Sequence, residues 1–284
     1  MADKSIIPIH DLSAKAQADL LIVRKFKINK DDVEVAHRHN YNQLLFIEKA
    51  KGVHEIDFIS YPLKNYSFHF VSSGQVHKLA INEKAIGGAL LFQREVFSET
   101  ANEKNVLENL PFFNRINYPV LETGKENFTR LTSLIQNIID EQESGNNFII
   151  KKNYLSILLL RLQQFYLQQK KTADIKADTP LLINRFLFMI EKECLVNNKV
   201  SWFADKLFVT PNHLNETSKN ITGKTALELV QEQILLEAKR MIIYTTLSIK
   251  EIAFACGFND VAYFIRFFKK HSALTPQEYR RQFH

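Results

Sequence analysis

The chain has 284 residues, 45% of them hydrophobic, and a net charge of +6. This length and composition suit one large or two ordinary globular domains with hydrophobic cores. No apolar run approaches the roughly 18 residues that a membrane-spanning helix needs, and the first residues lack the pattern of a signal peptide. These features exclude an integral helical membrane protein, and we expect a soluble, cytoplasmic chain.

The excess of positive charge lies in the C-terminal part. Residues 181–284 contain 14 Lys and Arg against 10 Asp and Glu. A basic domain favours a polyanionic partner, although charge alone is equally consistent with an ordinary solvated surface. The two cysteines, Cys194 and Cys256, have no neighbours at metal-ligand spacing, so we expect small buried residues and neither a disulfide nor a zinc site.

Residues 43–93 have the pattern of short strands. Turn signals separate the apolar segments QLLFIE, GVHEIDFIS, YSFHFV, VHKLAI and IGGALLF. Apolar and polar residues alternate within them, as at Ile56 and Phe58 or at Phe68 and Phe70, which predicts one buried face for each strand. Closely spaced strands of this kind predict a barrel or sandwich, which we place in residues 1–120.

From Glu126 to Lys171 the apolar period becomes that of a helix. The pattern runs on both sides of a break at SGNN, through Phe128, Leu131, Leu134, Ile135, Ile138 and Ile139, and then Tyr154, Leu155, Leu158, Leu162 and Phe165. It predicts a helical hairpin within residues 121–171. The apolar seam of this hairpin either packs on the barrel or pairs two subunits, and we assign the hairpin to dimerisation.

The polar residues 172–180 form the expected linker, ending in a helix-start signal at Thr179-Pro180. Residues 181–284 are then predicted to be an all-helical domain, which makes the chain α+β. Its helix starts carry three capping boxes, in which a Ser or Thr is followed by Glu three positions later: Thr225 with Glu228, Ser248 with Glu251, and Thr275 with Glu278.

The stretch SIKEIAFACGFNDVAYFIRFFKKH, residues 248–271, predicts two short helices with a turn at Gly257. In the second helix Phe264, Phe267, Phe268 and His271 share one face, and Ala262, Arg266 and Lys269 share the opposite one. A helix, a glycine-containing turn and a second helix that presents cations are typical of a DNA-binding helix-turn-helix. The alternative is an ordinary helical hairpin with solvated basic residues.

Residues 200–222, VSWFADKLFVTPNHLNETSKNIT, repeat this plan with a turn at Val209-Thr210-Pro211. A helix predicted from Ala226 to Tyr244 joins the two units and is about 28 Å long at about 1.5 Å per residue. Successive major grooves on one face of DNA lie about 34 Å apart. The spacing therefore predicts two recognition helices in adjacent grooves of one duplex.

Residues 200–283 resemble the DNA-binding domain of AraC/XylS-type bacterial transcription regulators. The resemblance is carried, in the family's order, by Ala204 and Leu207, then by TPNHL, TGKT, AKRMI, SIKEIAFACGF, YFIRFFKK and TPQEYR. It implies sequence-specific binding to double-stranded promoter DNA through both helix-turn-helix units. The chain departs from the family at Thr217 and Ser218, where bulky apolar residues are usual, and at Glu216, where a basic residue is common.

The resemblance also implies where DNA contacts lie, on the outward faces of the recognition helices. In the first helix these are Asn212, Asn215, Glu216 and Lys219, and in the second Val261, Ala262, Ile265, Arg266 and Lys269. Arg266 is the strongest candidate for base recognition, because an arginine can bind a guanine edge through two hydrogen bonds.

Residues 37–79 resemble, more loosely, the cupin-like sensing domain that is common in the same family. The resemblance depends on His37, His39, Gly52 and the segment Gly74 to His77. Cupin enzymes bind a metal with three such histidines and a glutamate near the position of Gln43, and glutamine is a poorer ligand. We therefore expect His37, His39 and His77 to border an effector pocket, or to be hydrogen-bonded structural residues, and we expect no metal or cofactor. His54 and His69 are expected to be ordinary surface or core residues.

The resulting prediction is a dimeric transcription regulator, not an enzyme, with an unknown small-molecule effector in the barrel. Activation is the commoner role in the family and adds RNA polymerase as a partner. The alternative is a metal-dependent cupin enzyme whose helical part only assembles it. The sequence contains no nucleophile elbow or phosphate-binding glycine loop that would favour an enzyme.

Overall fold

The computed structural model describes residues 9–10, 12, 20–28, 35–97, 110–113, 117–170 and 181–282. These residues divide into two compact units, one before and one after residues 171–180. The predicted linker at 172–180 lies outside the described residues, so the proposed domain boundaries stay predictions. No helix in these ranges is both long and apolar enough to span a membrane.

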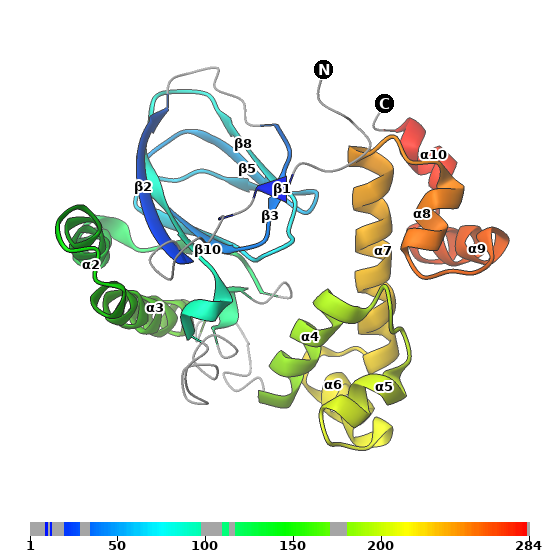
Figure 1. Cartoon of the computed structure of the whole chain (residues 1–284). Coiled ribbons are helices and arrows are strands. Elements are labelled where there is room, and N and C mark those ends of the chain that lie inside the picture. The colour runs from blue at the N-terminus through cyan, green and yellow to red at the C-terminus, as the bar shows by residue number, and fades with distance from the viewer. Residues whose placement is uncertain are drawn as a thin grey trace. The chain divides into compact units, whose positions relative to one another are not determined.

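The N-terminal unit is built on antiparallel sheets (Figure 1). One has five strands in the order β10-β7-β4-β9-β2, and another has three in the order β6-β5-β8; β1 and β3 form a short parallel pair. The strands are β1 Ile9–His10, β2 Leu21–Ile28, β3 Arg38–His39, β4 Asn42–Lys49, β5 Gly52–Ile56, β6 Ile59–Pro62, β7 Ser67–Val71, β8 His77–Ile81, β9 Ala85–Phe92 and β10 Val120–Glu122. Short 3-10 helices occur at η2 Arg94–Phe97 and η3 Pro111–Phe113.

Two features of the strands differ from the sequence prediction. GVHEIDFIS, predicted as one strand, is divided into β5 and β6 by a turn in which Asp57 and Phe58 have positive φ angles of 47° and 70°. All five residues of β7 are buried, so this strand does not have one solvated face. Its sheet is covered on both sides, because the smaller sheet packs on one face and helices pack on the other.

The predicted hairpin is present as α2 Gly124–Ser144 and α3 Phe148–Lys170. Apolar residues of both helices join strand residues such as Phe46, Phe68 and Leu90 in one core, on the outer face of the five-stranded sheet. The hairpin therefore packs on the sheet. The exposed side of α3 nevertheless carries Ile157 and Leu160, which are 47% and 50% exposed.

The C-terminal unit consists entirely of helices, as predicted. They are α4 Leu181–Glu193, α5 Val200–Lys206, α6 Pro211–Thr222, α7 Ala226–Tyr244, α8 Ile249–Ala255, α9 Val261–Ser272 and α10 Pro276–Arg281. All three capping boxes form at the predicted residues, at the starts of α7, α8 and α10. Cys194 and Cys256 are buried in this unit's core, as expected. The α+β prediction is thus confirmed.

Candidate DNA-binding surface

Two helix-turn-helix units lie at opposite ends of α7 (Figure 1). The first unit is α5 with α6 and the second is α8 with α9; helices of both units contact α7. The helix α7 has the predicted bounds, Ala226 to Tyr244. Its 19 residues give a length of about 28 Å at 1.5 Å per residue. This length is comparable with the roughly 34 Å that separates successive major grooves on one face of DNA.

The two units repeat the same local geometry. Each recognition helix starts at a capped residue: Thr210 accepts a hydrogen bond from the His213 amide, and Asp260 accepts one from the Ala262 amide. Each ends at a residue with a left-handed conformation, Gly223 or Ala273. Local backbone chemistry therefore fixes where both helices begin and end.

Gly257, in the turn of the second unit, is required for two reasons: its φ is positive, at 78°, and a neighbouring atom leaves no room for a side chain. A Cβ there would lie 2.4 Å from the Leu195 carbonyl oxygen, whereas a Cβ at Gly223, with φ of 76°, meets no atom within 4 Å. We expect Gly223→Ala to destabilise the unit by about 1 kcal/mol from the left-handed backbone alone, and Gly257→Ala by clearly more. Urea unfolding followed by fluorescence of Trp202, the chain's single tryptophan, checks this. Equal losses would contradict the role given to Leu195.

In α6 the predicted contact residues have different surroundings. Asn212, Glu216 and Lys219 are exposed, and Asn212 Nδ2 donates a hydrogen bond of 3.4 Å to Glu216 Oε1. Asn215 is only partly exposed, and its Oδ1 accepts a hydrogen bond of 3.1 Å from the Ala226 amide. Asn215 thus has a structural role at the start of α7 in addition to any contact with DNA.

In α9 the predicted residues form two groups. Ala262, Arg266 and Lys269 are exposed, whereas Val261 and Ile265 are partly buried against the helical core. The Arg266 side chain is 68% exposed, with its Nη2 3.9 Å from Asp260 Oδ2. Arg266 can therefore turn toward a ligand without breaking a buried interaction.

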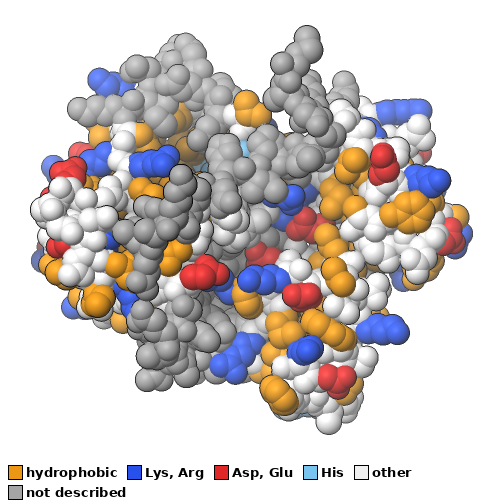
Figure 2. All heavy atoms as spheres, in the orientation of Figure 1, with side chains coloured by type: hydrophobic (Ala, Val, Ile, Leu, Met, Phe, Trp, Pro, Cys, Tyr) orange, Lys and Arg blue, Asp and Glu red, His pale blue; other side chains and the backbone are white. Residues whose placement is uncertain are grey.

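Two further exposed residues of α9, Tyr263 and Lys270, are not among the predicted contacts. The Arg266 guanidinium lies 5.9 Å from the centre of the Tyr263 ring. The helical period could have indicated that both residues are exposed, because neither lies on the face of the buried phenylalanines. In Figure 2 the Lys and Arg side chains are scattered over the visible face, with acidic and hydrophobic side chains between them.

The helix that joins the units contains a buried ion pair. Arg240 is fully buried, and its Nη1 donates a hydrogen bond to Oε1 of Glu237. Gln233 Nε2 donates to the same oxygen at 3.1 Å. Burial and the nearby Glu237 carboxylate raise the pKa of Cys256 to about 12, so this thiol stays protonated. Gln233, Glu237 and Arg240 all belong to α7, so these bonds lie within one helix, on its buried side.

The three histidines predicted for the effector site lie together in the N-terminal unit. His37 and His77 have ring centres 4.4 Å apart, and His39 and His77 have theirs 5.0 Å apart. His54 and His69, which the sequence analysis set aside, join them: His54 Nε2 lies 3.1 Å from His77 Nδ1, and its Nδ1 lies 3.2 Å from His69 Nδ1. The alternation in β5 could have indicated that His54 is buried, because His54 lies on the same face of the strand as the apolar Ile56.

These five histidines, which we call the histidine interior, are all buried. Burial lowers the pKa of His69 to about 4, and burial together with the neighbouring histidines holds the pKa of His54 well below its usual value. Both rings are therefore neutral near pH 7. Among the residues that the structure describes, no group of three or more His, Cys, Asp and Glu side chains is arranged to hold a metal ion.

Comparison with known proteins identifies the C-terminal unit. Residues 203–282 match the family model of a helix-turn-helix domain. The transcriptional activator RhaR of Mannheimia succiniciproducens is 24% identical over 250 residues, which are 87% of each chain. RhaS of Escherichia coli is 21% identical over 253 residues, 86% of this chain and 87% of the relative. The xylose operon regulatory protein of Haemophilus influenzae is 30% identical over 111 residues, 39% of this chain and 29% of the relative.

Among solved structures, ToxT from Vibrio cholerae, crystallised with an unsaturated fatty acid, aligns with 92% of this chain and 94% of its own, at 16% identity and a TM-score of 0.39. The helix-turn-helix match spans both units, from α5 to α10, and the similarity to RhaR and RhaS extends over most of the chain. These relatives are regulators and not enzymes, so the cupin-enzyme alternative has no support. The C-terminal unit is therefore an AraC-type helix-turn-helix DNA-binding domain, in a chain that is similar over most of its length to transcriptional activators.

Proposed function

We propose that this regulator activates transcription by placing α6 and α9 in adjacent major grooves of one promoter duplex, under the control of a small effector bound by its N-terminal unit. The observation that carries the proposal is the pair of recognition helices at the two ends of the 19-residue α7. The names of RhaR and RhaS support activation, which brings RNA polymerase in as a partner. Access to promoter DNA places the chain in the cytoplasm.

Selection of bound duplexes from a random pool by the full-length protein tests this proposal. Two short conserved blocks about one helical turn apart are expected, one for each recognition helix. A single block would mean that only one unit reads bases. Failure to enrich any sequence, with and without cell extract as a source of effector, would contradict the proposal.

Arg266 is proposed to read a base, and Lys269 to contact a phosphate. We expect Arg266→Ala to weaken binding to the selected site by about 1 to 3 kcal/mol and to relax preference at one position. Lys269→Ala should weaken binding to all sequences and reduce the slope of log K against log salt by about 1. Titrations at several salt concentrations distinguish the two effects, and Lys250→Ala, on the exposed side of α8, is the matched control.

We further propose that the chain dimerises through α3. Ile150, Ile157 and Leu160 on its exposed side are 40%, 47% and 50% exposed. With the exposed Asn153 and Gln164 they recur at the spacing of a coiled-coil seam. The three exposed apolar residues on one face of α3 support a second copy of α3 as the partner, because pairing would remove them from water.

A charge in the seam tests the dimer. Ile157→Glu should raise the dissociation constant of the dimer by more than about 100-fold, because a carboxylate would be buried without a partner. Light scattering after size-exclusion chromatography over a range of concentrations measures this change. Lys125→Glu, at an exposed position on α2, is the control and should leave the dimer unchanged. A dimer unaffected by Ile157→Glu would place the interface elsewhere.

The histidine interior remains the site that the sequence predicts for the effector, at His37, His39 and His77. Neutral imidazoles can donate and accept hydrogen bonds to an uncharged polar ligand. His77→Phe should then abolish the response of DNA binding to effector while leaving DNA binding itself intact. An unchanged response would remove these histidines from the effector site.

A further inference from the structure

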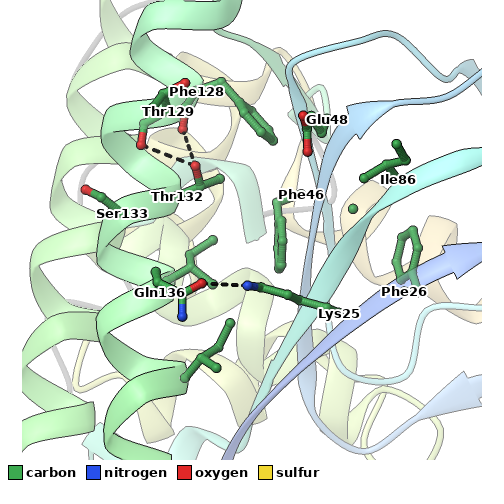
Figure 3. A pocket seen from close by; sticks show the side chains of 13 residues that line it. Lys25, Phe26, Phe46, Glu48, Ile86, Phe128, Thr129, Thr132, Ser133 and Gln136 are labelled. Carbon is green, nitrogen blue, oxygen red and sulfur yellow. Dashed lines mark hydrogen bonds between the residues drawn. The ribbon is translucent and has the colours of Figure 1, made fainter.

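A cavity of about 760 Å³ lies between the outer face of the five-stranded sheet and α2 (Figure 3). This volume is within the range of small-molecule sites. The cavity is separate from the histidine interior. Residues alternate along β4, so Phe46 and Glu48 face α2, whereas Leu45 faces the smaller sheet. We call it the α2 groove.

The absence of a side chain at Gly88 shapes the floor of the groove. Gly88 is paired with Lys25 on one neighbouring strand and with Phe46 on the other. A Cβ on Gly88 would lie 2.1 Å from Cζ of Phe46, so the Phe46 ring lies where the missing side chain would be. Phe26 and Ile86 from the sheet and Phe128 from α2 extend this apolar lining.

The two ends of the groove carry opposite charges. At one end Lys25 Nζ donates a hydrogen bond of 2.5 Å to Oε1 of Gln136, whose Nε2 donates to Asp140. Glu48 lies at the other end, beyond the Phe46 ring (Figure 3). Lys25 and Phe46 are two strand spacings apart, about 10 Å. Lys25 and Glu48 form no ion pair with each other in the part of the chain that the structure describes.

Hydroxyls along the α2 wall are already engaged. Thr129 and Thr132 donate to backbone carbonyls of their own helix, and so does Ser133. These side chains therefore present methyl and methylene groups to the groove. Polar recognition is left to Lys25 with Gln136 at one end and to Glu48 at the other.

We propose that the α2 groove binds a small organic acid with an aromatic body. The carboxylate binds Lys25 in place of Gln136, the ring packs between Phe46 and Phe128, and a hydroxyl or amino group at the far end donates to Glu48. As a binding site the groove stands independently of the proposed function; as a second regulatory site, apart from the histidine interior, it rests on that function. A ligand here would act on α2, which packs along α3.

Fluorescence of 8-anilinonaphthalene-1-sulfonate, an anionic aromatic probe, tests the site in the full-length protein. We expect saturable binding of one probe per chain. Lys25→Gln should weaken it by about tenfold, the value of one charge-assisted hydrogen bond. Thr132→Phe, which places a ring in the groove, should weaken it at least as much, whereas Lys125→Gln, an exposed lysine on the same helix, should leave it unchanged.

The Thr132 hydroxyl bonds to carbonyls of its own helix, and a thermal melt of the variant checks that the fold is kept. Lys25 is exposed, so its replacement reports on binding even if Thr132→Phe unfolds. Wild-type affinity in both variants, or the absence of saturable binding to the wild type, would overturn the proposal.

Competition identifies the ligand class. We expect 3-(4-hydroxyphenyl)propanoate to displace the probe at lower concentration than 3-phenylpropanoate, and the difference to vanish in Glu48→Gln. Equal competition in the wild type would overturn the role of Glu48. Binding of the selected duplex is measured on the same variants: lost probe binding with intact DNA binding supports the groove, while failed DNA selection with intact probe binding overturns only the proposed function.

Discussion

Arg240→Ala is expected to lower the free energy of unfolding of the helical unit by about 3 to 5 kcal/mol. The substitution removes the cation and leaves the Glu237 carboxylate buried in the core, which costs more than the lost packing alone. This is a large part of the 5 to 15 kcal/mol that typically stabilises a domain. Urea unfolding followed by Trp202 fluorescence measures it, because the only tryptophan lies in this unit.

A double variant separates charge from packing. Arg240→Met with Glu237→Gln removes both charges at similar volume, so it should be more stable than Arg240→Ala alone. Lys250→Ala, which removes an exposed cation, should change stability by less than about 0.5 kcal/mol. The role given to the ion pair is contradicted if Arg240→Ala is as mild as Lys250→Ala, or if the double variant is no more stable than Arg240→Ala.

Mild acid is expected to destabilise the N-terminal unit selectively. In the folded chain the pKa of His69 is about 4 and that of His54 is well below 6.5, so unfolding takes up protons below about pH 6.5. The stabilisation is fully present above that pH and is lost as the pH falls toward 4. His69 alone lowers the free energy of unfolding by about 2 kcal/mol at pH 5, and His54 lowers it further.

Urea unfolding at pH 7 and pH 5 tests this expectation with two signals. Pulsed hydrogen exchange of peptides from β4, β7 and β9 follows the sheets, while Trp202 fluorescence follows the helical unit as an internal control. His69→Gln should flatten the pH dependence of the first signal, and His213→Gln, an exposed histidine on α6, should not. Equal acid shifts in both signals would show that the buried histidines are not the cause.

Local signals in the sequence predicted the helical unit closely. The capping box at Thr225 and the periodicity up to Tyr244 set the bounds of α7, because both signals act within one helical turn of the backbone. The helical spacing of the aromatic residues in α9 likewise predicted that Phe264 and Phe268 would be buried. These features depend on neighbours in the chain, which the sequence contains directly.

The predictions were weaker wherever contacts join distant segments. The turn at Asp57 and Phe58 has no glycine, so β5 and β6 were read as one strand. His54 and His69 were assigned no role, since their contact is made across two sheets. Asn215 was expected to face DNA, and its bond to the Ala226 amide depends on how α6 meets α7.

The sequence alone thus determined the α+β class, the two helix-turn-helix units, the helix between them and the type of DNA-binding domain that they form. Caps, periodicity and motif order specify these features, and all are properties of short segments. Only the tertiary structure decided that five histidines share one interior, that Arg240 and Glu237 are buried together, and that the Phe46 ring lies over Gly88 in the lining of a groove beneath α2. Each of these depends on strand pairing and helix packing over long sequence separations, and no local pattern of residues encodes that geometry.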